Sequence, residues 1–272
     1  MKPALFMVDL DGTLIGPGLR IARPDRMAIA RALECGVDVC LATGRLFDAS
    51  RRFADELQLR GYITVLQGSQ IYELSTGRLV HAAPLQRELA LQAFDALKAR
   101  GFHLQLYFGD RLYLDELDER ARYYLSMSQV QPEVVSDLRT LLDGSPPPGP
   151  GPMKVLGVDD PAKVSSTVPL LARTLGPAVS VFKSQPAYLE VIDAHADKAG
   201  ALRWIAAARG IALADTAAIG DSDNDVTMLR LAGRSFAVGN ATPAAKQAAQ
   251  TVVAPVDRHG VADAVEILMG AA

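Results

Sequence analysis

Near its start the chain reads Leu5-Phe6-Met7-Val8-Asp9-Leu10-Asp11-Gly12-Thr13-Leu14. The four apolar residues 5–8 predict a fully buried strand. Asp9 and Asp11 are two positions apart, so in an extended chain their side chains face the same space just past the strand end. Two carboxylates this close repel each other unless a cation lies between them. Mg²⁺ suits such oxygen ligands, so the stretch favours a magnesium site over an ordinary Asp-Gly turn.

Composition indicates a globular protein. The 272 residues are 49% hydrophobic and 22% charged, which is enough to bury a sizeable core. A net charge of −3 argues against nucleic acid or a membrane surface as a partner. The sequence contains no long apolar run and starts without a signal peptide, so we expect a cytoplasmic protein. Cys35 and Cys40 are expected to be small core residues, not a disulfide or metal pair.

A second predicted strand, 37–41, leads into Ala42-Thr43-Gly44-Arg45 and a helix over 46–57. A hydroxyl, free backbone N–H groups and a guanidinium at a helix start can hold a phosphate. Thr-Gly-Arg by itself is more typical of a plain turn than of a phosphate site.

Two further segments carry charged residues at the start of a helix or the end of a strand. Lys198 begins a predicted helix running to residue 209, where a cation opposes the helix dipole. A surface lysine tolerates this position, but a bound phosphate would explain it. A buried strand over 216–219 is followed by Gly220-Asp221-Ser222-Asp223-Asn224-Asp225-Val226-Thr227-Met228-Leu229. This oxygen-rich segment is not an EF-hand loop, because it lacks the glycine and glutamate which that loop requires.

Taken in order, these segments resemble the motifs of the haloacid dehalogenase superfamily of phosphatases. The stretch 9–14 is similar to its first motif, residues 43–45 to its second, Lys198 to its third, and 220–229 to its fourth at every fixed position. Segments 238–241 and 257–262 also resemble the C-terminal parts of Cof-type members. Gln67 departs from this pattern, because Cof-type relatives commonly carry Asn there.

The resemblance and the element order together predict an α/β fold with an inserted domain. Residues 1–83 and 188–272 are expected to form a discontinuous core, with a Rossmann-like parallel sheet. The texture changes at Pro84, and residues 84–187 are expected to form an inserted α+β cap that selects the substrate. Within it we expect an alternating strand over 102–108, a Pro- and Gly-rich loop over 144–152 and a helix over 161–175. Tyr107 and Tyr113 are its candidate substrate contacts.

Residues that end parallel strands meet at one edge of an open α/β sheet, so the motifs are expected to converge. Asp9 is the predicted nucleophile. Asp11 is the predicted acid, and then the base that activates water. The expected ligands of Mg²⁺ are the Asp9 carboxylate, the Asp11 backbone carbonyl and Asp221. Asp225 is expected to orient metal-bound water, and Arg45 to lie beside these groups or the substrate.

The phosphoryl oxygens are expected to contact several donors at the same edge: the side chains of Thr43, Lys198 and Asn224 and the backbone N–H groups of Leu10 and Gly44. The predicted activity is Mg²⁺-dependent hydrolysis of a small phosphorylated metabolite, such as a sugar phosphate, through an aspartyl-phosphate. A phosphomutase of the same superfamily shares these motifs. A phospho-accepting signalling domain also uses acids, a Thr and a Lys, but it needs neither Asp11 nor a cap.

Overall fold

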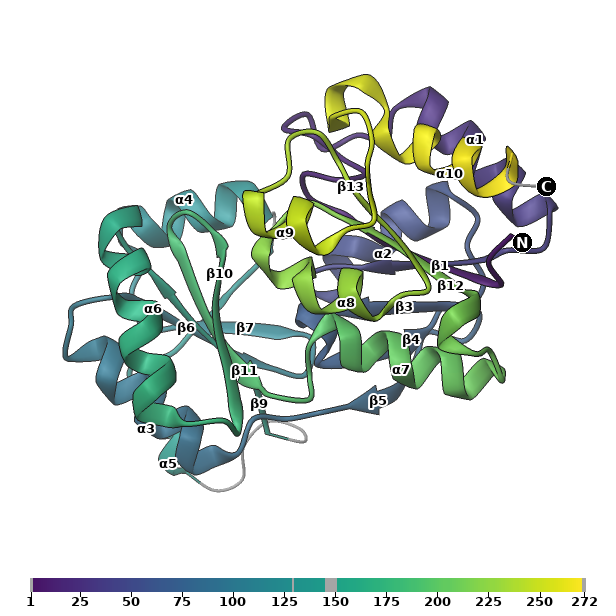
Figure 1. Cartoon of the computed structure of the whole chain (residues 1–272). Coiled ribbons are helices and arrows are strands. Elements are labelled where there is room, and N and C mark those ends of the chain that lie inside the picture. Colours follow the sequence, from purple (N-terminus) through teal and green to yellow (C-terminus); the bar gives the residue numbers. More distant parts are fainter. Residues whose placement is uncertain (1, 129, 145–150, 271–272) are drawn as a thin grey trace.

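The computed structural model describes residues 2–128, 130–144 and 151–270. Figure 1 shows two lobes, each built on its own β-sheet. Most of the predicted loop over 144–152 lies outside the described residues. Within the described ranges, no helix combines the length and the apolar sequence needed to cross a membrane.

The larger sheet joins strands from both ends of the chain. Its strands, in spatial order, are β14 (Thr251–Val252), β13 (Arg234–Ala237), β12 (Thr216–Gly220), β1 (Leu5–Asp9), β2 (Asp38–Ala42), β3 (Tyr62–Val65), β4 (Gln70–Glu73) and β5 (Arg78–Ala82). Pairing is parallel from β14 to β3 and antiparallel from β3 to β5. Strand β1 is buried along its whole length, as expected for a central strand covered on both faces.

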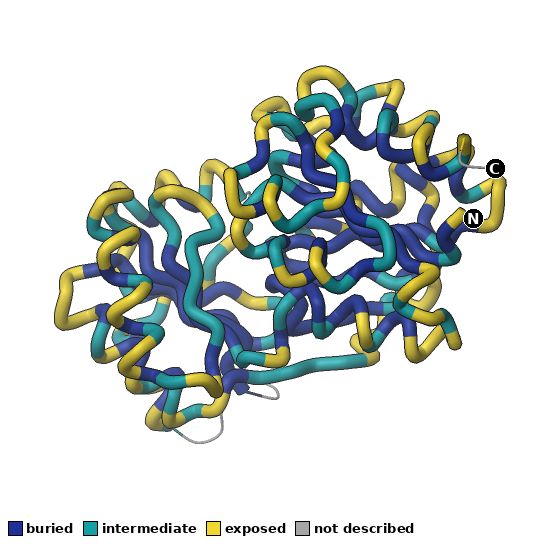
Figure 2. The backbone as a smooth tube through the Cα atoms, in the orientation of Figure 1, coloured by how far each residue is buried: buried dark blue, intermediate teal, exposed yellow. Residues whose placement is uncertain are grey.

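Helices cover this sheet on both sides, which confirms the predicted α/β class. They are α1 (Arg23–Glu34), α2 (Phe47–Glu56), α7 (Lys198–Arg209), α8 (Val226–Leu231), α9 (Pro243–Ala248) and α10 (Gly260–Gly270), with short turns η1 (Leu66–Gly68), η2 (Leu213–Asp215), η3 (Asp223–Asp225) and η4 (Val256–Arg258). Helix α1 packs against α10, and α7 packs against α8. Figure 2 shows the buried strands between these exposed helix surfaces.

The second sheet is formed by the segment between β5 and α7. Its strands, in spatial order, are β10 (Val179–Gln185), β11 (Tyr188–Asp193), β9 (Pro152–Val158), β6 (His103–Phe108), β7 (Arg111–Leu114) and β8 (Glu133–Val134). Its helices are α3 (Arg87–Lys98), α4 (Glu119–Ser128), α5 (Arg139–Asp143) and α6 (Pro161–Leu175). We call the part from α3 to β11 the inserted unit.

The expected domain boundary at 187/188 lies too early in the chain. Strand β11 pairs with β10 and β9 inside the second sheet, so that sheet continues to Asp193. The reason is physical: a buried apolar strand carries no mark of the sheet that it joins. Pairing partners far away in sequence decide this, and here they lie in the inserted unit.

Alternation along these strands gives the second sheet two different faces. One face packs against its own helices through apolar side chains, among them Leu104, Val155 and Leu189. Lys154 and Glu190, one position away from residues of that apolar face, are also buried. They lie on the face turned to the larger sheet, so this face carries polar groups where the two lobes meet.

The cysteines differ from each other. Cys40 is buried in the core, as predicted, whereas Cys35 is exposed at the end of α1, which corrects the expectation for that residue. Both are free thiols.

Candidate active site

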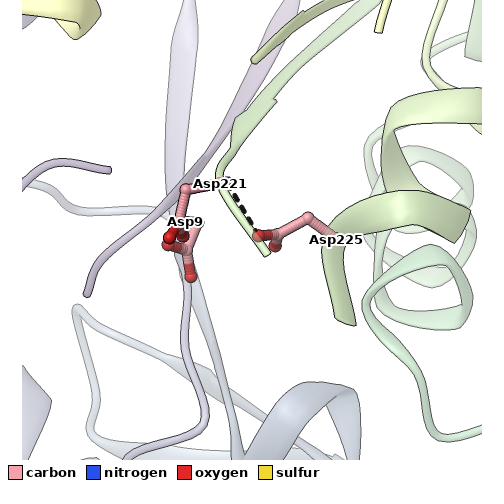
Figure 3. Close-up of side chains that lie close together, drawn as sticks. All are labelled: Asp9, Asp221 and Asp225. Atoms are coloured by element: carbon pink, nitrogen blue, oxygen red, sulfur yellow. Dashed lines mark hydrogen bonds between the residues drawn. The ribbon is translucent and has the colours of Figure 1, made fainter. Parts of the chain in front are cut away.

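Three carboxylates meet at the carboxyl edge of the larger sheet. Asp9 ends β1, Asp221 follows β12, and Asp225 closes the turn after Asp221. One oxygen of each lies within 4.8 Å of the others, and Figure 3 shows the carboxylates of Asp9 and Asp221 side by side. Residues more than 200 positions apart are therefore brought together because parallel neighbours β1 and β12 end at the same edge.

Lys198 places one cation among these acids. Its Nζ, fully buried, donates to Asp9 Oδ1 at 2.5 Å and to Asp225 Oδ1 at 2.6 Å. Burial alone would lower the pKa of Lys198, but the charges of Asp225 and Asp9 outweigh it and raise the pKa. The lysine therefore stays a charged ammonium. It is the first residue of α7, as the sequence predicted.

The two oxygens of Asp225 are both engaged. Oδ1 accepts from Lys198, and Oδ2 accepts from the backbone N–H groups of Asp221 and Ser222, each at 3.0 Å. Asp9 Oδ2, by contrast, is buried without a hydrogen-bond partner among the described residues. A cation bound here would find free oxygens on Asp9 and Asp221, with Asp225 orienting the loop that carries Asp221.

The electrostatics of the site favour a bound cation. Burial, together with Asp225 and Asp221, raises the pKa of Asp9 well above its ordinary value, although Lys198 lowers it. Burial and then Asp225 raise the pKa of Asp221 to about 7. One lysine does not offset three carboxylates, two of which are buried, and a bound divalent cation would favour the ionised form of Asp9 and Asp221.

Close packing explains the glycine of the first motif. Gly12 has a φ of +88°, and a Cβ there would lie 2.4 Å from Asp221 Oδ2. Thr13 Oγ1 donates to Asp221 Oδ1 at 3.2 Å, and Asn240 Nδ2 donates to the Gly12 carbonyl at 2.8 Å. The Asp-Gly-Thr turn therefore holds the Asp221 carboxylate against the end of β1.

Asp11 lies apart from the carboxylate cluster, paired with Arg45. The guanidinium donates to Asp11 through Nη2 at 2.6 Å and Nε at 2.7 Å, in a bidentate arrangement. Burial opposes the charge of Arg45, but the hydrogen bonds and charge of Asp11 raise its pKa overall. The bidentate pairing fixes the direction in which the carboxylate of Asp11 points.

The remaining predicted phosphate contacts surround the same edge. Thr43 is buried after β2, and its Oγ1 accepts from the backbone N–H of Arg45 at 3.1 Å. Leu10 directly follows Asp9, and Gly44 lies between Thr43 and Arg45. Asn224 lies nearby, but its Nδ2 donates to Gln67 Oε1 at 2.7 Å, so one of its two N–H groups is already used.

The structure adds two residues that sequence reasoning missed, Lys154 and Glu190, and places them beside Gln67. Gln67 (φ 66°, buried) donates to Glu190 Oε1 at 3.4 Å, and Glu190 Oε2 lies 3.1 Å from Lys154 Nζ. Lys154 Nζ also donates to the Gly44 carbonyl at 3.4 Å. We call Gln67, Asn224, Lys154 and Glu190 the interface cluster. The sequence contained a sign of this cluster, because Lys154 and Glu190 are charged residues inside apolar strands.

The two tyrosines predicted as substrate contacts, Tyr107 and Tyr113, lie on opposite faces of the second sheet. Tyr113 packs in the apolar core of the inserted unit, which argues against substrate contact. Tyr107 is on the other face, where its ring lies 4.4 Å from Lys154 Nζ and its hydroxyl hydrogen-bonds to Tyr124. Tyr107 therefore borders the interface cluster.

Lys198→Met is expected to destabilise the protein by about 3–5 kcal/mol at pH 8 in chelator, because it leaves buried carboxylates without their counter-ion. Without the lysine, the folded-state pKa of Asp9 rises further above its unfolded value, because Lys198 is the group that lowers it. The folded state then binds protons more tightly, so the loss should shrink as the pH falls to 5.5. Urea denaturation at both pH values measures this.

Lys98→Met is the matched control, since its ion pair with Asp115 is exposed and worth at most about 1 kcal/mol. A Lys198→Met loss no larger than that of the control, or one independent of pH, would contradict the counter-ion role.

Residues 6–265 match the family of haloacid dehalogenase-like hydrolases. The HMP-PP phosphatase of Cronobacter sakazakii is 28% identical, over 86% of this chain and 84% of its own. The phosphoglycolate phosphatase of Pyrobaculum aerophilum is 30% identical, over 99% and 97%. A haloacid dehalogenase-like hydrolase from Bacteroides thetaiotaomicron has a crystal structure with a TM-score of 0.82 at 27% identity, covering 98% of this chain and all of that one. The chain belongs to the haloacid dehalogenase superfamily and is a phosphatase of its Cof type.

Proposed function

We propose that the protein is a Mg²⁺-dependent phosphatase that hydrolyses a small phosphorylated metabolite through an aspartyl-phosphate. The observation that carries this is the buried Oδ2 of Asp9, which has no hydrogen-bond partner in the described part of the chain and lies in a cluster with more negative than positive charge. One oxygen of Asp9 would attack phosphorus, and the other would remain for the cation and Lys198. Phosphoryl transfer needs mainly positioning and charge neutralisation, and the surrounding residues supply both.

In this proposal each residue has one task. Asp9 attacks phosphorus, while Lys198 and Thr43 hold the phosphoryl oxygens. Asp11, aimed by Arg45, gives a proton to the leaving alkoxide and later takes one from the attacking water. Before the first step one oxygen of Asp11 takes a proton from solvent, while Arg45 keeps its hydrogen bond to the other oxygen and so keeps the acid aimed.

The donor set suits a hard divalent cation. Carboxylate oxygens of Asp9 and Asp221, with the backbone carbonyl of Asp11, would hold Mg²⁺. When bound, the ion would neutralise charge on the phosphoryl group during transfer. Asp225 is then a positioning residue, because its two oxygens hold Lys198 and the Asp221 loop.

We propose that the inserted unit is the cap, and that its interface cluster recognises the leaving group. Lys154 and Glu190 are buried as an ion pair, so their charges cancel, and both offer hydrogen bonds. Such a surface favours a neutral leaving group rich in hydroxyls, which is the chemistry of a sugar phosphate. A leaving group that carries a carboxylate would be repelled by Glu190.

The free thiols fit a reducing compartment such as the cytoplasm.

Phosphate release from a panel of esters, with and without chelator, tests this function. We expect release from glucose 6-phosphate or ribose 5-phosphate to exceed release from phosphoglycolate. EDTA should abolish it, excess Mg²⁺ should restore it, and Ca²⁺ should substitute poorly because it prefers more ligands at longer distances. Undiminished turnover in EDTA would remove the metal from the mechanism, and transfer without net phosphate release would favour the phosphomutase.

A further inference from the structure

The start of helix α2 is capped from the inserted unit. Leu46, at the N-cap position, provides no side-chain acceptor, so the first N–H groups of the helix need one from elsewhere. Asp110 lies in the tight turn between β6 and β7. Its Oδ1 accepts from the Phe47 N–H at 2.6 Å and its Oδ2 from the Asp48 N–H at 3.2 Å. A carboxylate here also meets the positive end of the helix dipole.

This contact lies two residues after Arg45, the side chain that holds Asp11. On the other side, the Arg45 N–H donates to Thr43 Oγ1 and the Arg45 carbonyl accepts from the Leu66 N–H at 3.0 Å. The short segment that carries Arg45 is therefore anchored at both ends. The anchor after Arg45 is Asp110, which comes from the inserted unit.

We propose that Asp110 is a positioning residue for the acid–base step. By docking on the start of α2 it holds Arg45, and through Arg45 the carboxylate of Asp11, in the geometry that protonates the leaving group. The inference rests on the proposed function. Lys154 supports it, since its Nζ contacts the Gly44 carbonyl just before Arg45. The inserted unit thus acts on the acid–base carboxylate as well as facing the leaving group.

The docked carboxylate has an altered proton affinity. Burial raises the pKa of Asp110 to about 6, the N–H groups of Phe47 and Asp48 lower it, and the Asp48 carboxylate adds to the rise. Tyr72 faces it from β4, where burial together with Asp110 and Asp48 raises the pKa of that phenol. A pKa that is higher when docked means that the docked state binds the proton more tightly. Docking therefore strengthens as the pH falls below about 6 and levels off at a weaker value above it.

Three variants separate positioning from general structure. Asp110→Ala removes both acceptors, Asp110→Asn keeps one oxygen for Phe47 without a charge, and Arg111→Ala is the matched control. Arg111 is the next residue of the same hairpin, and its exposed side chain pairs with Glu133 inside the inserted unit. None of these side chains touches the carboxylate cluster.

The first readout is kcat/KM for an alkyl and an aryl ester, glucose 6-phosphate and p-nitrophenyl phosphate. Only the alkyl leaving group needs a proton, so Asp110→Ala should lose about tenfold or more on the sugar ester and less than about threefold on the aryl ester. Asp110→Asn should recover most of the loss, and Arg111→Ala should match the wild type. Equal losses on both esters would overturn the positioning role.

The second readout does not depend on activity. Amide hydrogen exchange over 43–50 should speed up in Asp110→Ala but not in Arg111→Ala. Protection in the wild type should fall from pH 5.5 to 8, and it should stay constant in Asp110→Asn. Unchanged protection in Asp110→Ala would overturn the docking. A wild type that releases phosphate from neither ester would contradict the proposed function instead, while the exchange data would still decide the docking.

Discussion

Replacing Asp9 by Asn is expected to reduce turnover on the order of 10⁴-fold or more, with the fold intact. The amide keeps the shape of the carboxylate, but it loses the nucleophile and a metal ligand together. Stability should not suffer, because the change removes one of three mutually repelling carboxylates while Lys198 keeps its bond to Asp225. Steady-state phosphate release and urea denaturation measure the two quantities.

Asp55→Asn is the control for this change, since that side chain is 64% exposed and outside the site. It should leave both turnover and stability unchanged. Phosphate release at the wild-type rate by Asp9→Asn would exclude Asp9 as the nucleophile. A large loss of stability would mean that the lost turnover says nothing of chemistry.

Asp11→Asn is expected to affect two steps differently. Loss of the proton donor should slow cleavage of an alkyl phosphate by about 10²–10⁴-fold, and of p-nitrophenyl phosphate far less, because p-nitrophenolate leaves without a proton. Hydrolysis of the aspartyl-phosphate still needs a base. The variant should therefore release a burst of p-nitrophenol near one equivalent per site, followed by slow turnover, in rapid-mixing absorbance measurements.

The same experiment on Asp9→Asn should show no burst, because no covalent intermediate forms. If Asp11→Asn shows no burst and loses activity equally on aryl and alkyl esters, its acid–base role is wrong. Asp11 would then act through its contact with Arg45 or through the loop. A burst without further turnover in the wild type would instead favour a phospho-accepting signalling domain.

The larger sheet was predictable because its strands follow a simple rule. Each of these central strands contains a mostly apolar run, and the residue that carries chemistry ends the strand or follows it directly, as at Asp9, Thr43 and Asp221. Helix starts were equally clear where a chemical signal marks them, such as Pro161 after the capping Asp160, and Lys198 after Asp197. These signals are local, so a single sequence contains them.

The missed features depend on contacts between distant segments. Strand β11 has the pattern of a buried strand in either sheet, and only its pairing with β9 and β10 assigns it. Lys154 and Glu190 of the interface cluster stand out in the sequence, because each is a charged residue inside an apolar strand. Nothing in the sequence says that they meet Gln67 or Gly44. Asp110 had no signal beyond a Gly-Asp turn, because its partners are backbone N–H groups in the other lobe.

Convergence of the motif residues was predicted, but their pairing was not. Asp225 was expected to orient water on a metal, whereas both its oxygens bind groups of the protein. Asp11 was expected beside Asp9, but it is turned toward Arg45. Side-chain direction depends on which donor is nearest, and that is decided by packing. The catalytic roles of these residues stay predictions.

The most direct test of the central claim is the mass of the peptide that carries residue 9. Asp11→Asn protein is mixed with p-nitrophenyl phosphate and Mg²⁺, quenched in acid at the end of the burst and digested. The account predicts that this peptide gains the mass of one phosphoryl group, attached to Asp9. The double variant Asp9→Asn/Asp11→Asn should show no such gain. An unmodified Asp9 peptide after a full burst, or a phosphoryl group on another residue, would contradict it.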